Sequence, residues 1–562
     1  MRIAVGVRSD GGAALLPLAD DGTAVGAVER VDDLAAAVAE RERLGPRWVW
    51  SASRMVYPPL LAAGVRVARC HDIELTESLL LGHAGRYGEP RSVRAAWARS
   101  RGEPVPADEP LEDAGRQPSL FDESGPGEDV EMIAAVHAGQ LARIAAGSAG
   151  LSLLAAAESA GGLIAAEMGH DGLPWRADLH DALYTELLGP RPSLGMRPRK
   201  LQALADQVAE AFGHVVNPDS PAQVVKAFKD AGFPVPSTRA HVLKQIDHPA
   251  VPIVLEYKEL ARLWTAHGWT WLDAWVHDGR FRPEYVVGGV VSGRWATRGG
   301  GALQIPKVLR RAAVADPGWK LVVADAAQLE PRVLAALAGD RAFAAAAAQG
   351  DLYAALAHAF ETAGTTRTAS GVAAAKDGPS ARDKAKIALL SAMYGGGTGE
   401  GVQLLGVLRS RFPEAYEYVE NAAREGERGR LVRSRLGRTC PPPSAAWREV
   451  AGQESGGGAA RSRGRFTRNF VVQATAADWA LVLLASLRRR LASLSGAYGS
   501  EGAHLVFFQH DEVVVHTPEK QAEAVATAIR ESAEEAGHLM FGRTPVVFPM
   551  HIATVDCYAD AK

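Results

Sequence analysis

Cysteine is scarce in this 562-residue chain, which has only Cys70, Cys440 and Cys557. An odd number of widely separated cysteines excludes a disulfide scaffold and a short zinc motif, and it favours a reducing compartment. The N-terminus has no basic leader, and no run of about 18 uncharged apolar residues is evident elsewhere. We therefore expect a cytoplasmic protein that has no membrane partner.

The net charge is also small, because 65 acidic and 62 basic side chains leave a formal charge of −3. Taken alone, that balance argues against a nucleic-acid partner, since phosphate binding needs a basic surface. Hydrophobic residues make up 47% of the chain, which excludes a disordered or collagen-like protein. A chain of this length can bury several cores, and we expect two to four domains.

Segments of different character divide the chain. Up to about residue 100, helical segments alternate with short β-like runs at Ile3–Val7, Trp48–Trp50 and Val65–Val67. This alternation is typical of a small α/β domain. Residues 100–127 are rich in Pro, Gly, Ser and acidic residues and predict a surface loop or linker. A mostly helical region follows at 130–275, and it includes a long amphipathic helix at Pro249–Leu263.

Two later segments predict strands beside acidic residues. Lys320–Ala324 reads as a buried strand that ends at Asp325, and the runs Leu505–Phe508 and Val513–Val515 predict a hairpin around Asp511 and Glu512. A carboxylate at a strand end can hold a cation. Helix capping explains Asp325, and turn chemistry explains the hairpin acids, equally well. Neither signal is specific when it is taken alone.

A predicted helix carries cations along one face. Arg382, Lys386, Leu390 and Tyr394 recur every four residues, so they share that face. Two cations followed by a ring and by Gly395–Gly397 could grip a polyphosphate and close against a base. A solvated basic face is the alternative reading of the cations, but it accounts poorly for the ring and the glycines.

Arginines also gather late in the chain, with few acids between them. Such density in a nearly neutral chain favours a strip that follows a phosphodiester backbone over a merely solvated face. The arginines of this strip are Arg424, Arg428, Arg430, Arg433, Arg435, Arg438, Arg448, Arg461, Arg463, Arg465 and Arg468.

Two distant carboxylates, a phosphate-gripping helix and a basic strip together fit two-metal phosphoryl transfer on nucleic acid. Their order resembles that of family A DNA polymerases, the DNA polymerase I group. Val323–Arg332 resembles motif A, Arg382–Gly395 resembles motif B and Gln509–Glu512 resembles motif C. Further matches in the family's order are Ser292–Arg294, Leu303–Pro306 and Arg465–Asp478. The resemblance covers about residues 130–562.

The resemblance implies a role for each matched residue at the reaction centre. Asp325 and Asp511 would hold two Mg²⁺ ions, with Mn²⁺ as an alternative, and Glu512 would support them. Lys386 would also neutralise or protonate the pyrophosphate, so the implied catalytic set is Asp325, Asp511, Glu512 and Lys386. The implied nucleotide-binding set is Arg382, Lys386, Leu390, Tyr394, Gln328 and Glu330, in which Glu330 would be the steric gate against ribonucleotides.

The resemblance also implies contacts to primer–template DNA. These contacts can sense base-pair geometry without reading sequence, because the minor groove presents acceptors at the same places for every correct pair. The implied partners are primer–template DNA and dNTPs, and we expect a nucleoid-associated monomer. The DNA-binding set is Arg294, Gln304, Arg465, Asn469, Gln473 and His510.

Several positions depart from the family pattern. Ala326 replaces the usual aromatic residue of motif A, and Pro331 replaces a leucine at a place where proline is acceptable early in a helix. In motif B, Leu390 stands where Phe or Tyr is common, beside Leu389 in place of Asn. Tyr353 stands where a phosphate-contacting histidine is common. In the family the ring at the position of Leu390 packs beside the incoming sugar, so its replacement predicts altered nucleotide discrimination and slower turnover, while the retained acidic, cationic and gate residues still predict polymerase activity.

The expected fold is a multidomain α/β and α+β protein, with a reduced RNase H-like exonuclease domain before a right-hand polymerase of palm, fingers and thumb. It would resemble actinobacterial-type bifunctional 3′–5′ exonuclease/polymerases with a degenerate exonuclease. The predicted parts are an exonuclease-like domain at 1–135, a thumb and the start of the polymerase at 136–280, palm at 281–340 and 426–562, and fingers at 341–425.

Loss of proofreading is expected, because the exonuclease resemblance lacks its carboxylates. The chain reads as starting one strand late, without the strand that carries the first Asp-x-Glu pair. Tyr57 stands at the second catalytic position, and only Glu128–Asp129 resembles the third, with Gly125 in place of a partner tyrosine. One carboxylate cannot hold two divalent ions against their hydration.

The sequence therefore predicts a template-directed DNA polymerase in repair or gap filling. Two alternatives stay open at this point. One is a polymerase with an active 3′–5′ exonuclease, and the other is a non-catalytic protein that binds primer–template.

Overall fold

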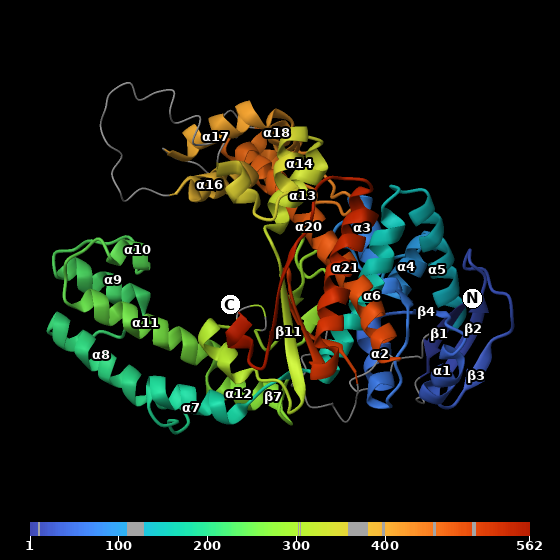
Figure 1. Cartoon of the computed structure of the whole chain (residues 1–562), viewed down its shortest axis with the longest axis horizontal. Coiled ribbons are helices and arrows are strands. Elements are labelled where there is room, and N and C mark those ends of the chain that lie inside the picture. The colour runs from blue at the N-terminus through green and yellow to red at the C-terminus, as the bar shows by residue number, and fades with distance from the viewer. Residues whose placement is uncertain are drawn as a thin grey trace. The chain divides into compact units, whose positions relative to one another are not determined.

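The computed structural model describes residues 1–8, 12–109, 129–301, 303, 305–357, 380–395, 400–452, 457–496 and 502–561. The chain forms two compact units (Figure 1). Unit 1 comprises Met1–His170, Tyr285–Ala296 and Val322–Thr554, and unit 2 comprises Asp171–Glu284, Thr297–Leu321 and Val555–Lys562. The finer division predicted from the sequence, into an exonuclease-like domain, thumb, palm and fingers, stays a prediction.

The N-terminal part of unit 1 is a five-stranded sheet with helices on both faces. The sheet has the order β3-β2-β1-β4-β5, with β1 antiparallel to β2 and parallel to β4. Alternate residues of the central strand enter different cores: Ile3 and Val5 pack with Trp48 and Trp50, whereas Ala4 packs on the opposite face. The elements are β1 (Arg2–Val7), β2 (Ala13–Leu18), β3 (Glu29–Val31), α1 (Leu34–Glu42), β4 (Arg47–Trp50), α2 (Ser53–Ala62), β5 (Cys70–Asp72), α3 (Ile73–His83), α4 (Val93–Arg101) and α5 (Val130–Ala145).

One prediction for this sheet is wrong. Val65–Val67 is not a strand, because the last strand of the sheet is β5, three residues later. Val67 is nevertheless fully buried, so its apolar character reflects packing and not a sheet position. The central strand β1 (Arg2–Val7) contains no acidic residue. The predicted absence of the strand that carries the Asp-x-Glu pair stays a prediction.

A second sheet of unit 1 carries the predicted acidic strand ends. It has the order β12-β13-β11-β14, and its central strand β11 confirms the strand predicted before Asp325. The predicted hairpin is also confirmed, because β12 and β13 pair antiparallel and place Gln509 opposite Glu512. The strands are β11 (Trp319–Ala326), β12 (His504–Gln509), β13 (Glu512–Pro518) and β14 (Met550–Val555).

Helices complete unit 1. The 39-residue α20 is its longest described helix and has a largely apolar buried face, which packs against α18 and α21. Pro331 lies in the first turn of α13, where its missing N–H costs no helical bond. The remaining elements of unit 1 are α6 (Leu151–Asp171), β9 (Tyr285–Val286), β10 (Ala296–Thr297), α13 (Leu329–Ala338), α14 (Arg341–Ala347), α16 (Ala381–Tyr394), α17 (Glu400–Arg411), α18 (Pro413–Glu427), α19 (Ala445–Ala451), α20 (Gly457–Ser495), η3 (Glu519–Gln521) and α21 (Ala522–Phe541).

Unit 2 is mainly helical, as the sequence predicted for 130–275. Its core joins α8, α9 and α11 through residues such as Val208, Phe228 and Val254, and α11 confirms the predicted amphipathic helix. Its elements are β6 (Leu173–Pro174), α7 (Ala177–Leu188), α8 (Arg199–Phe212), α9 (Pro221–Asp230), α10 (Ala240–Leu243), α11 (Ala250–His267), α12 (Trp269–Trp275), β7 (Val276–His277), β8 (Arg280–Phe281), η2 (Lys307–Ala312) and η4 (Tyr558–Ala561).

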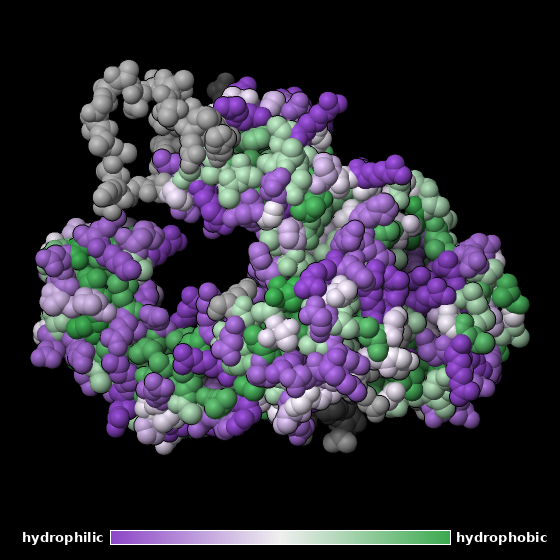
Figure 2. Space-filling model, in the orientation of Figure 1, coloured by the Kyte–Doolittle hydropathy of each residue, from purple (hydrophilic) through white to green (hydrophobic). Residues whose placement is uncertain are grey.

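Two described helices, α6 and α20, are long and apolar enough to cross a membrane by length and composition alone, which the sequence reading missed. Their most apolar windows are 67% and 89% buried inside the protein, respectively. Packing within the protein therefore accounts for their apolar character. On the face shown in Figure 2, hydrophilic residues predominate and hydrophobic residues form smaller groups among them.

Candidate active site

Asp325 and Asp511 lie on neighbouring segments of the second sheet. Asp325 is on β11, Asp511 is in the turn between β12 and β13, and β11 pairs with β13. The amide of Ala326 donates to the carbonyl oxygen of Asp511 at 3.2 Å, which ties the two segments together. Both carboxylates are half-buried, and Glu512 beside them is buried.

The electrostatics of this pair favour a cation. Burial, reinforced by repulsion from Asp325, raises the pKa of Asp511 to about 7. A divalent ion between two such carboxylates would relieve both penalties. Among the residues that the structure describes, no group of three or more metal-ligating side chains occurs. The two carboxylates fit Mg²⁺, which commonly takes one or two carboxylates and completes its shell with water and substrate phosphates.

Predicted residues from four segments converge on a cavity of about 200 Å³ that Asp511 helps to line. Glu330, in the first turn of α13, links two of these residues. Its carboxylate accepts hydrogen bonds from the Tyr394 hydroxyl at the end of α16 and from the Arg294 guanidinium. The cavity is lined by Arg294, Leu329, Glu330, Tyr394, Ala476, Ala477, His510 and Asp511.

The pKa values of two lining residues follow from this setting. Burial, together with the hydrogen bond to Glu330, raises the pKa of Tyr394 above its ordinary value, so its hydroxyl stays a donor. Burial, with repulsion from Arg294, lowers the pKa of His510. His510 also adopts a left-handed backbone conformation, with φ +59°, which non-glycine residues rarely keep without a local reason.

The predicted cationic face of α16 is confirmed as an outward face. Arg382, Lys386 and Tyr394 are exposed and Leu390 is half-buried. Leu389, which the sequence comparison placed beside the nucleotide-facing position, is fully buried. Ser380 caps the helix by accepting from the Asp383 amide at 3.1 Å, and the helix ends at Gly395. The glycines at 396 and 397 lie outside the described residues.

The predicted DNA-binding residues of α20 form a row that leads to the cavity. Arg465, Asn469 and Gln473 are spaced by four residues and share one face, and the next position of that row is the cavity residue Ala477. Gly395 abuts this row, since a Cβ there would lie 2.7 Å from Cγ of Arg465. Its φ of +67° also favours glycine. Gln304, the remaining predicted DNA contact, lies outside the described residues.

Residues 196–555 match the model of DNA polymerase family A. The match covers more than half of the chain and includes every residue of the candidate site. The chain belongs to DNA polymerase family A.

Several DNA polymerases I resemble the chain in sequence. It is 28% identical over 376 residues to the thermostable DNA polymerase I of Thermus filiformis. That alignment covers 60% of this chain and 42% of the Thermus protein. It is 26% identical over 379 residues to the DNA polymerase I of Chloroflexus aurantiacus. That alignment covers 63% of this chain and 36% of the Chloroflexus protein. The chain thus spans about two-fifths of the length of these relatives.

The fold of this family A chain also has a counterpart among solved structures. The POL domain of Pol1 from M. smegmatis, solved in complex with DNA primer–template and dNTP, superposes with a TM-score of 0.71 at 19% identity. The superposition covers 100% of this chain and 96% of that chain. The predicted multidomain fold is therefore confirmed.

The arginine strip of this family A chain is only partly open, which corrects the prediction of one continuous basic surface. Arg438 is buried and forms ion pairs with Glu158 at 2.6 Å and Asp478 at 2.7 Å. Other members of the strip are engaged by acidic side chains or backbone carbonyls. These engaged arginines are Arg424, Arg428, Arg430, Arg433, Arg435, Arg463 and Arg468.

Three strip residues keep the predicted character. Arg448, Arg461 and Arg465 are exposed, and no salt-bridge partner for them lies among the described residues. Arg461 and Arg465 stand one turn apart at the start of α20, so they extend the row that ends at the cavity.

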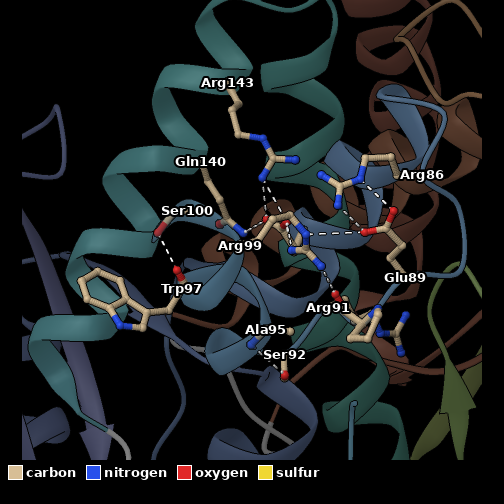
Figure 3. A network of polar contacts seen from close by, with 12 residues as sticks. Arg86, Glu89, Arg91, Ser92, Ala95, Trp97, Arg99, Ser100, Gln140 and Arg143 are labelled. Atoms are coloured by element: carbon tan, nitrogen blue, oxygen red, sulfur yellow. Dashed lines mark hydrogen bonds and ion pairs between the residues drawn. The ribbon is translucent and has the colours of Figure 1, made fainter. Parts of the chain in front are cut away.

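Acidic side chains of the N-terminal sheet domain are already occupied by structural contacts. Glu77 is fully buried and accepts from Arg99 at 2.9 Å and from Arg143 at 2.9 Å. Figure 3 labels these two arginines. Asp129 caps α5 by accepting from the Glu131 amide, and Glu128 lies outside the described residues. The hydroxyl of Tyr57 is engaged by a glutamate of α6.

Sequence reasoning missed one acidic residue of the site. Asp351 accepts hydrogen bonds from two predicted nucleotide-binding residues, Gln328 at 2.7 Å and Arg382 at 2.9 Å. It also accepts from the Ala354 amide. An acid directly before a helical run reads as an ordinary helix cap, so the sequence held no signal for its second role.

Proposed function

We propose that this chain is a template-directed DNA polymerase that adds dNTPs to a primer 3′-hydroxyl by two-metal phosphoryl transfer. The observation that carries the proposal is the convergence of Asp511, Glu330, Tyr394 and Arg294 on one cavity beside Asp325. Phosphoryl transfer needs such a place, where a metal-binding carboxylate pair adjoins groups that orient a nucleotide.

Each residue of the candidate site has a defined task in this proposal. Asp325 and Asp511 would hold two Mg²⁺ ions, which would supply activation of the primer hydroxyl and neutralisation of the triphosphate charge. Arg382 and Lys386, exposed on α16, bind the triphosphate, and Lys386 protonates or neutralises the departing pyrophosphate. Glu330 occupies the space that a ribose 2′-hydroxyl would need.

The primer–template lies along the α20 row in this proposal. Arg465 binds the backbone, whereas Asn469 and Gln473 contact the minor groove, whose acceptors occupy common positions in all correct pairs. Arg294 and His510 contact the primer end from the cavity wall. We further propose that the protein works as a cytoplasmic, nucleoid-associated monomer in repair or gap filling, without proofreading.

Primer extension on a gapped template, read at single-nucleotide resolution, tests the proposal. We expect Mg²⁺-dependent addition of the templated nucleotide by the wild type and none by Asp325→Ala or Asp511→Ala. Both variants should unfold at or above the thermal midpoint of the wild type, since the repulsion between the two carboxylates is removed. Extension by either variant at the wild-type rate contradicts the mechanism. Gel-shift binding of primer–template without any extension supports a non-catalytic binding protein in its place.

A further inference from the structure

The start of α13 carries a strained residue that is held by its own side chain. Gln328 has a left-handed backbone, with φ +56° and ψ +45°. Its side-chain oxygen accepts from the Leu352 amide at 2.9 Å, and its side-chain nitrogen donates to Asp351 at 2.7 Å. Such strain persists where the surroundings fix it, commonly at functional sites.

Hydrogen bonds from Arg332 fix the turn that carries Asp351. Arg332 of α13 is fully buried and donates to the carbonyl oxygens of Gln349 at 3.0 Å and Gly350 at 2.6 Å. It also donates to the carbonyl oxygen of Ala347 at 2.7 Å. The backbone just before Asp351 therefore has little freedom, and so has the carboxylate.

Asp351 holds Arg382 by one nitrogen only. Its second oxygen accepts from Nε of Arg382 at 2.9 Å, and the guanidinium stands 5.6 Å from the ring of Tyr353. Among the described residues, no partner takes the two terminal nitrogens of Arg382, whose side chain is 48% exposed. Those two nitrogens form the fork that binds phosphate oxygens in pairs.

We propose that Asp351 is a positioning residue, which anchors Arg382 through Nε so that both terminal nitrogens face the triphosphate of the incoming nucleotide. The inference rests on the proposed polymerase function and adds a residue to it. One rigid carboxylate thus sets two nucleotide-side groups, Gln328 and Arg382, in a fixed relation to each other. Burial opposes ionisation of this carboxyl, but the hydrogen bonds from Gln328 and Arg382 outweigh it and lower its pKa to about 2.

Asp351→Asn separates this role from simple filling of space. The amide nitrogen of the new side chain must face either the Gln328 amide nitrogen or Nε of Arg382, and both are donors. Gln328 cannot turn its amide over without losing its bond to the Leu352 amide. The variant therefore releases Arg382 or Gln328 while the side-chain volume stays the same.

The primary test is the KM for the correct dNTP in single-nucleotide insertion. We expect Asp351→Asn to raise this KM about tenfold, because a hydrogen bond between charged groups is lost, and to change kcat less than about twofold. Asp383→Asn is the matched control, since Asp383 neighbours Arg382 on α16 but bonds to Ser380. Its KM should stay at the wild-type value. A dideoxy-terminated primer gives a second readout, the dNTP concentration that half-saturates the ternary complex.

The double variant with Arg382→Ala decides whether Asp351 acts through Arg382. In that background we expect Asp351→Asn to raise KM less than about twofold. A full tenfold rise there, or an unchanged KM in the single variant, overturns the inference and leaves the polymerase function standing. Wild-type protein that neither extends the primer nor forms the dNTP-dependent complex overturns the function and the inference together.

Discussion

The hydroxyl of Tyr57 donates to the carboxylate of Glu167 at 2.6 Å, inside the core that joins α2 to α6. Arg488 of α20 binds the same carboxylate through two nitrogens, at 2.8 and 2.6 Å. Arg488 also donates to the carbonyl oxygens of Val67 and Ala68. The N-terminal sheet domain is thus joined by a buried ion pair to the helix that carries the predicted DNA-binding row.

Replacing Arg488 should destabilise the protein strongly. Arg488→Met leaves Glu167 buried without its cation, and loss of one partner of a buried pair costs about 3–5 kcal/mol. Chemical denaturation monitored by circular dichroism measures the free energy of unfolding. Arg489→Met is the control, because that neighbouring side chain is 60% exposed in its pair with Glu535 and should cost under about 1 kcal/mol. Equal losses in the two variants would contradict this account.

The protein should not shorten DNA from its 3′ end. The central strand β1 has no acidic residue, Tyr57 is bound to Glu167, and Glu77 is saturated by arginines. A 3′-labelled single strand incubated with Mg²⁺ and no dNTPs should stay intact. Shortening that persists in Asp325→Ala and through further purification would mean that the N-terminal domain is an active exonuclease.

Removing the side chain of Glu330 should relax sugar selection. Glu330→Ala opens the cavity beside Asp511 and frees Tyr394 and Arg294. We expect the ratio of kcat/KM for dNTP to that for the matching rNTP to fall at least about tenfold, the size of one lost steric or polar discrimination. Glu330→Gln keeps the volume and should keep most of the selectivity. An unchanged ratio in Glu330→Ala removes the gate assignment.

Two buried imidazoles should make the fold sensitive to acid. The rings of His71 and His137 stand 4.3 Å apart, burial lowers the pKa of His71 to about 4, and burial with repulsion from His71 lowers that of His137. Below the ordinary histidine pKa the unfolded chain therefore binds more protons than the native one. Stability is full above about pH 6.5 and falls as the pH drops toward 4, by on the order of 1 kcal/mol per unit for each imidazole.

A histidine variant isolates this effect. Burial raises the pKa of Asp72 to about 6, which gives the opposite slope between about pH 4 and 6, so the comparison must be made between proteins and not between single pH values. His137→Phe keeps a ring but removes one titrating group. Urea unfolding at pH 7 and pH 5 should show a smaller loss on acidification in His137→Phe than in the wild type. Parallel losses would contradict the assignment.

Much of this site could be predicted from the sequence because its residues sit in motifs with local structural meaning. The strand before Asp325, the hairpin around Asp511 and the four-residue spacing from Arg382 to Tyr394 each specify an element and a face. Ordered motifs then place these elements in one family. The local patterns alone left capping, turn chemistry and a solvated face as alternatives.

What the sequence could not supply was the pairing of side chains across elements. Asp351 reads as a helix cap until the structure places Arg382 and Gln328 on its oxygens. Arg438 reads as one more surface arginine until Glu158 and Asp478, from distant segments, are found around it. Composition shows how many charged side chains a segment has but not which acidic groups pair with them. The sequence therefore predicted a larger exposed basic surface for the arginine strip than the structure has.

Under the proposed function, the length of the α20 row sets how much duplex DNA the row can contact. From Arg465 to Ala477 the helix rises about 18 Å, at about 1.5 Å per residue. Duplex DNA rises about 3.4 Å per base pair, so in the proposed complex the row would match about five base pairs behind the primer end. If the proposed function holds, a mismatch within that span would disturb contacts of the row that ends at the cavity, whereas a mismatch farther back would lie beyond the row. The length of one helix face would thus set how far behind the primer end the duplex is contacted.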